Sequence, residues 1–196
     1  YSGVVIFFLL CCTALVLVIG AAKFTTRAGA SGSGLEATTA TNEVDALLSA
    51  LEATVTDAMQ LNECGEAEAG QLRALAREEP GRARQLEFIA SHVEIYSQDA
   101  VKTALLGGDH IDFALELPFR APDSSGLDSE ISVQAGAVPY MSQYDERWGY
   151  HAYGSSVMGI TGCGPTCLAM VAAGLNGDGS INPARVADFA MANGYY

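Results

Sequence analysis

The first apolar segment of the chain runs without a charged residue from Val4 to Ala22. A helix of this length can cross a hydrocarbon core of about 30 Å, and the run is longer than the apolar core of an ordinary signal peptide. We therefore expect residues 1–24 to form a single-pass anchor in the cell membrane, with the body of the protein extracellular. The small residues Gly20-Ala21-Ala22 leave open a cleaved signal peptide instead.

Small and polar residues follow, and they predict a flexible linker over residues 25–42. From Asn42 the apolar residues recur at helical spacing. Three further helices are predicted, over Glu66–Glu78, Arg82–His92 and Gln98–Leu106, separated by Pro and Gly breaks. Residues 43–120 are therefore expected to form a small helical region. It could be a spacer, a cover for a functional site or a partner-binding surface.

The C-terminal third alternates between turn-forming and apolar stretches. Residues 121–137 read as a second linker, rich in Pro, Ser and Gly. The run Val138–Gln143 predicts a short strand, and an apolar helix is expected from Cys163 onward. Asn182 and Pro183 predict the start of a last helix, which Gly194 ends. Together these elements predict an α+β fold behind the membrane helix.

Charge narrows the function classes. The 196 residues carry a formal net charge of −13, and the acidic residues are concentrated between Leu35 and Ser132. A nucleic-acid-binding protein needs a basic surface, so this partner is excluded. Acidity of this kind favours solubility and repels anionic surfaces.

The candidate chemistry lies at Cys163. Gly162 and Gly164 flank it, Pro165 suits the first turn of a helix, and the segment after Cys167 is apolar on every face. A helix N-terminus favours the thiolate form of a cysteine, which is the nucleophilic form. The alternative is that Cys163 is a small buried hydrophobic residue. No further ligands at zinc spacing accompany the cysteines, so neither a metal nor a cofactor is predicted.

Two motifs carry a resemblance to a known family. The segment from Gly162 to Met170 (GCGPTCLAM), preceded by Val138–Gly149 (VPYMSQYDERWG), resembles the start of a bacterial papain-like cysteine peptidase domain of the bacteriocin-processing (double-glycine-leader) type. The resemblance covers residues 138–196. It implies that Cys163 is the nucleophile, that Gln143 donates to the oxyanion hole, and that the substrate is a peptide or protein.

The resemblance also implies a catalytic histidine on a strand downstream of the cysteine. No histidine follows Cys163 in this sequence, and His151 is a weak candidate for the base. We therefore expect residues 138–196 to be the cysteine-bearing half of the domain only. Three hypotheses follow: a cysteine peptidase, an inactive peptide- or cell-wall-binding module on the same fold, and an amidase or acyltransferase that uses the same chemistry.

Overall fold

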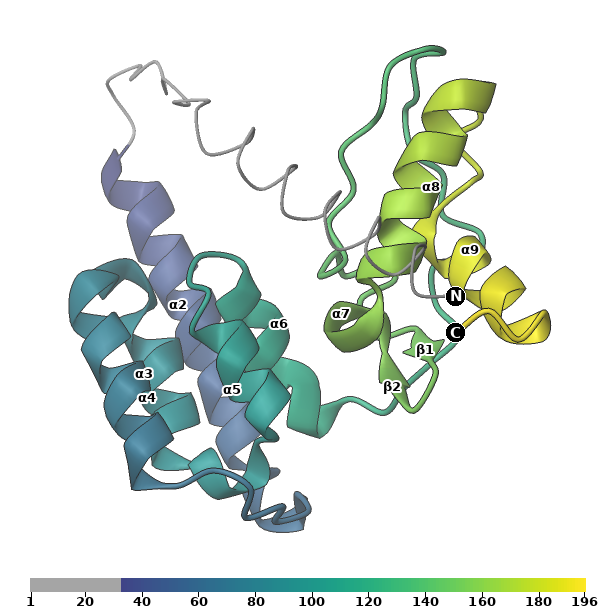
Figure 1. Cartoon of the computed structure of the whole chain (residues 1–196). Helices are drawn as coiled ribbons and strands as arrows, with labels where there is room; N and C mark the ends of the chain where they lie inside the picture. The colour runs from purple at the N-terminus through teal and green to yellow at the C-terminus, as the bar shows by residue number, and fades with distance from the viewer. Residues whose placement is uncertain (1–32) are drawn as a thin grey trace. The chain divides into compact units, whose positions relative to one another are not determined.

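The computed structural model describes the backbone of residues 33–196 and the side chains of residues 42–196 (Figure 1). The predicted membrane anchor at Val4–Ala22 lies outside these residues. Among the helices within them, none combines the length and the apolar character needed to cross a membrane. Residues Asn42–Tyr196 belong to one compact unit, which carries the cores, the cavities and the candidate site described below.

The described chain is mainly α-helical, so the prediction of an α+β fold is wrong. The strands found in its described part are β1 (Ala152–Tyr153) and β2 (Ser156–Val157), which pair antiparallel. The predicted strand at Val138–Gln143 is irregular. Pro139 has no N–H for a ladder, and neither of the two short strands pairs with this segment.

The helical region contains five α-helices joined by short 3₁₀ turns. α3 has the predicted bounds, and α4 and α5 begin within one residue of the predicted starts. α2 begins at Ser33, so the predicted linker 25–42 is wrong from that residue onward; alanine, leucine and glutamate there are good helix formers. α6 was not predicted. The helices are α2 (Ser33–Glu52), α3 (Glu66–Glu78), α4 (Ala83–Ser91), α5 (Gln98–Ala104) and α6 (His110–Glu116).

The core of this region lies among α3, α4, α5 and α6, whose apolar faces meet. Leu72, Leu86 and Ile89 are fully buried there. Tyr96 is also buried, and its hydroxyl donates to the carbonyl of Leu115 at 2.9 Å. Burial raises the pKa of this phenol, which therefore stays protonated. The helical region thus has a closed core of its own.

The C-terminal part, here called the cysteine region (residues 121–196), contains α7 (Met158–Thr161), α8 (Cys163–Asn176) and α9 (Pro183–Ala192). α8 packs against α9 (Figure 1). The predicted cap of the last helix is confirmed, because the Asn182 side chain accepts from the Arg185 N–H at 3.0 Å. Gly177 ends α8 with a φ of 62°, a left-handed conformation that favours glycine.

Residues 121–137 are not a free linker, and that prediction is wrong. They form few regular elements, but Leu127, Ile131 and Val133 pack on the core of the cysteine region. The Asn182 side-chain amide donates to the carbonyls of Gly126 and Ser129 at 2.8 and 2.7 Å. Long-range contacts therefore hold a segment whose composition alone is typical of a linker.

Trp148 is the centre of this second core. Its side chain is fully buried among Met141, Ala169, Ala173 and Ala184. The indole N–H donates to the carbonyl of Ser142 at 2.8 Å, which satisfies the one polar group of the ring. Trp148 thus connects the residues before the cysteine motif with α8 and α9.

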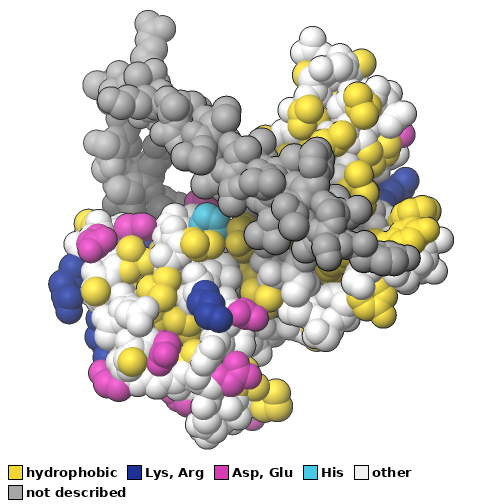
Figure 2. Space-filling view, in the orientation of Figure 1, with side chains coloured by type: hydrophobic (Ala, Val, Ile, Leu, Met, Phe, Trp, Pro, Cys, Tyr) yellow, Lys and Arg dark blue, Asp and Glu magenta, His cyan; other side chains and the backbone are white. Residues whose placement is uncertain are grey.

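One face of α8 is exposed in the described structure. The small residues Ala169 and Ala173 face the core, whereas Leu168, Val171 and Leu175 are 54%, 46% and 78% exposed. Figure 2 shows hydrophobic side chains over α8, at the upper right of the view. A helix that is apolar on every face is expected to be buried all round, but α8 is not, because its core contacts are made by the alanine face.

Candidate active site

Cys163 is the first residue of α8, and its side chain is exposed. Gly162 before it is buried, and its N–H donates to the Met158 carbonyl at 2.7 Å. A Cβ at Gly162 would lie 2.4 Å from that same oxygen, so the turn requires glycine. The prediction that Cys163 begins a helix is confirmed. The alternative, a buried apolar cysteine, is contradicted by its exposure.

Gln143 is anchored to the turn that precedes Cys163. Its side-chain amide nitrogen donates to the carbonyl of Gly159, in α7, at 2.9 Å. An amide nitrogen carries two hydrogens, so one donor remains for a second acceptor. The structure therefore brings Gln143 to α7, directly before the helix that Cys163 opens.

Two tyrosines near Cys163 were missed in the sequence analysis. Burial, and then the charge of Cys163, raise the pKa of both Tyr144 and Tyr153. Both phenols therefore stay neutral and keep an O–H that can donate near the sulfur. Tyr144 lies inside the quoted motif, next to Gln143, but nothing in the local pattern marks it as a neighbour of the cysteine.

Asp145 and Arg147 form a bidentate ion pair. The guanidinium donates to the carboxylate at 2.8 and 2.7 Å, and the Arg147 N–H adds a third hydrogen bond at 3.0 Å. The guanidinium also lies 4.4 Å from the centre of the Trp148 ring. Asp145 and Arg147 therefore help to position Trp148, and their side chains are paired with each other rather than with Cys163.

This ion pair gives stability that depends on pH. The hydrogen bonds from Arg147 hold the pKa of the Asp145 carboxyl below its usual value, although burial opposes them. A carboxyl with a lowered pKa in the folded state stabilises the fold above the unfolded pKa, and this contribution is lost as the pH falls through the folded value. We expect Asp145→Asn to cost about 1 kcal/mol at neutral pH, after allowance for solvent screening. Urea unfolding from pH 7 to pH 3 measures this, and a gap between mutant and wild type that does not narrow in acid would contradict it.

His92 and His151 are engaged away from Cys163, whereas His110 packs on Tyr144 and lines one of the cavities there. His151 is buried, with Nδ1 at 2.8 Å from the Ser125 carbonyl and Nε2 at 2.8 Å from Asp188. His92 contacts the Phe88 carbonyl and lies 3.5 Å from Glu52. His110 contacts the Gly107 carbonyl, and its ring meets the edge of Tyr144 at 4.5 Å. His151 therefore joins β1 to α9 and to residues 121–137, and has no free nitrogen for a base.

α6 packs directly against residues 144–159 of the cysteine region. The Phe113 ring stacks on Tyr150 with centroids 4.9 Å apart, and it meets Tyr144 at 5.6 Å. A Cβ at Gly159 would lie 2.1 Å from the same ring, so only glycine lets α7 approach α6 this closely. The helical region, through α6, therefore contacts the segment that precedes Cys163.

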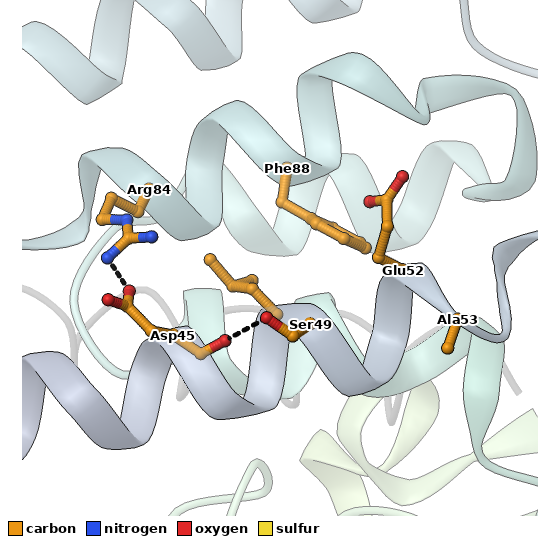
Figure 3. Close-up of a pocket in the computed structure, with 7 residues that line it drawn as sticks. Asp45, Ser49, Glu52, Ala53, Arg84 and Phe88 are labelled. Carbon is orange, nitrogen blue, oxygen red and sulfur yellow. Dashed lines mark hydrogen bonds and ion pairs between the residues drawn. The ribbon is translucent and has the colours of Figure 1, made fainter.

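Three cavities of about 280–320 Å³ are lined by Tyr144, and residues of α5, α6 and α7 also line them. A larger depression of about 700 Å³ lies elsewhere, between α2 and α4 (Figure 3). Asp45 and Arg84 form an ion pair at one end of it, and Phe88 lines it. Its lining includes no cysteine or histidine, so the cavities at Tyr144 are the better candidate site. Among the described residues, no group of three or more acidic, histidine or cysteine side chains is placed to hold a metal ion.

Comparison with known proteins does not add an identity. No protein family model, no curated protein and no solved structure matches this chain. The function is therefore inferred from the described residues, which form a mainly helical fold with an exposed cysteine at the start of a helix.

Proposed function

We propose that the protein is a cysteine hydrolase that cleaves a peptide bond with Cys163 as its nucleophile. The observation that carries the proposal is the exposed thiol on the first residue of α8. Helix N-termini hold unpaired N–H groups and a partial positive charge, which favour a thiolate and the oxyanion that forms after its attack. The resemblance of residues 138–196 to cysteine peptidases of the double-glycine-leader type supports the same proposal.

The chemistry requires three groups at the reacting carbonyl. The Cys163 sulfur attacks the carbonyl carbon, and the negative oxygen accepts from the Cys163 backbone N–H and from the free hydrogen of the Gln143 amide. The carbon–nitrogen bond then breaks as the leaving amine takes the proton that the thiol gave up, and water hydrolyses the thioester to a carboxylic acid and the free thiol. Burial and the charge of Cys163 keep the phenols of Tyr144 and Tyr153 neutral, so each retains an O–H donor.

The histidines favour a second candidate function. A thiolate peptidase needs a base that takes the thiol proton and returns it to the leaving amine. His92 contacts Phe88 and Glu52, and His151 is held by Ser125 and Asp188. His110 packs on Tyr144 with its Nδ1 at the Gly107 carbonyl, and within the described residues no hydrogen bond joins it to Cys163. This observation favours a module that binds peptides through the same surface without cleaving them.

Thiol labelling together with a peptide library tests the proposal. We expect iodoacetamide to modify Cys163 about tenfold faster than Cys167, because Cys163 is exposed at the helix N-terminus and Cys167 is half-buried. Peptide mapping by mass spectrometry measures both rates, and the same protein is incubated with the library. Cleaved peptides support the hydrolase. Binding without cleavage favours the binding module, and equal labelling of the two cysteines contradicts the assigned nucleophile.

A further inference from the structure

Two of the cavities at Tyr144 are also lined by Leu106. One, of about 280 Å³, extends to Gly159, Ile160 and Thr161, and the other, of about 320 Å³, extends to Tyr140. Leu106 and Tyr144 line both, and the two cavities are here together called the groove. Leu106 is 62% exposed, although it follows a helix whose other apolar residues are buried.

The loop that carries Leu106 is fixed in place. Gly107 and Gly108 have φ values of 77° and 57°, which glycine adopts without strain. The Gly108 N–H donates to the Glu79 carboxylate at 3.0 Å, and a Cβ at Gly107 would lie 2.2 Å from that carboxylate. The exposed leucine therefore lies on a loop whose neighbouring backbone is held by the end of α3.

The groove comes within two residues of the nucleophile along the chain, although Cys163 is not one of its lining residues. Thr161 lines it and precedes Cys163 by two residues, so their Cα atoms are at most about 7.6 Å apart. Burial, and then the charge of Cys163, raise the pKa of Tyr144, which lines both cavities of the groove. An extended peptide whose carbonyl is at Cys163 can therefore place a nearby side chain between Leu106 and Tyr144.

We propose that this groove is the specificity site of the hydrolase, and that it binds an apolar side chain of an extended peptide substrate against Leu106 and Tyr144. The proposal rests on the function proposed above. The exposed leucine and the tyrosine ring provide apolar contact area on both sides of the side chain. The helical region thus selects the substrate that Cys163 attacks.

The charge around the groove excludes anionic peptides. The third cavity at Tyr144 is lined by five carboxylates. Three arginines form ion pairs with them: Arg82, Arg120 and Arg147. Asp99 and Asp109 line the two cavities beside Leu106, where Lys102 pairs with Asp99. An aspartate side chain in the groove would meet a surplus of negative charge as well as the apolar Leu106.

Peptide vinyl sulfones that differ in a single residue test this inference. These probes add to the thiolate through a new carbon–sulfur bond, and intact-mass spectrometry of the full chain follows the reaction. We expect probes with Leu or Phe at the varied position to modify Cys163 about tenfold or more faster than the Asp probe, the factor expected for burial of one apolar side chain. Leu106→Asp should remove this preference. Leu175→Asp, which changes an exposed leucine at the far end of α8, should keep it.

Iodoacetamide separates thiol reactivity from peptide recognition, and its rate should be the same in all three proteins. An unchanged Leu-over-Asp preference in Leu106→Asp would overturn the inference, as would the absence of any preference in the wild type. Cleavage of library peptides at wild-type rates by Leu106→Asp would refute the groove and leave the hydrolase intact. A Leu106-dependent preference in a protein that cleaves no peptide would refute the hydrolase and leave the groove intact.

Discussion

Replacement of Cys163 by alanine is expected to lower kcat/KM for peptide hydrolysis by about 10⁴-fold or more, because removal of a covalent nucleophile removes the reaction path itself. The side chain is exposed, so the substitution leaves no buried cavity. Peptide turnover by the wild type and the variant, measured at equal concentrations, gives the ratio.

Three variants of the same chain serve as comparisons. Cys167→Ala, on the next turn of α8, and Cys64→Ala, in the core of the helical region, should retain turnover when the protein is folded. Gln143→Ala should lose about 100- to 1000-fold, as expected for one oxyanion donor. If Cys163→Ala kept the wild-type rate, or if Cys167→Ala alone abolished it, the assignment of the nucleophile would fail.

Replacement of Trp148 by alanine is expected to lower the free energy of unfolding by about 3–5 kcal/mol. The ring is fully buried between residues 121–137, α8 and α9, so alanine leaves a cavity at the point where these segments meet. The Ser142 carbonyl also loses its indole donor. Urea unfolding followed by far-UV circular dichroism measures the loss.

Trp148→Phe separates the two contributions, since phenylalanine keeps most of the ring volume and removes only the N–H donor with part of the packing. It should cost less than the alanine variant. Leu175→Ala, at an exposed position, should stay within about 0.5 kcal/mol of the wild type. A loss for Trp148→Ala no larger than that of Leu175→Ala would mean that the second core does not contribute to stability.

Features with strong local signals could be predicted from the sequence. The bounds of α3 follow from its apolar spacing and from Pro80-Gly81 after it, and α9 begins where Asn182 and Pro183 predict. Cys163 belongs to this group, because the glycines around it and the apolar segment after it fix the start of α8. The element with the proposed chemistry was therefore visible without any tertiary information.

Features that depend on contacts between distant residues could not be predicted from the sequence. Residues 121–137 have the composition of a linker, and they are ordered by Asn182 and by the core around Trp148. α6 has only seven residues and directly follows two glycines, so its periodicity is too short to recognise. Tyr144 became a candidate only once α6 placed Phe113 and His110 against it.

The predicted α+β fold failed for a related reason. A strand is stable only beside another strand, and the extended run at Val138–Gln143 has no strand beside it in the described structure. The run is fixed instead by Met141, which is buried beside Trp148, and by Gln143, which bonds to α7. The sequence pattern at Val138–Gln143 therefore belongs to a segment that is packed but does not form a strand.

The position of Trp148 makes the cysteine region separately visible to spectroscopy. It is the single tryptophan of the 196 residues, and it is buried in the core formed by α8, α9 and residues 121–137. Intrinsic tryptophan fluorescence therefore reports the unfolding of that core, whereas circular dichroism is dominated by helices that include α2 to α6. Superimposable melting curves from the two signals would mean that the helical region and the cysteine region unfold as one cooperative unit.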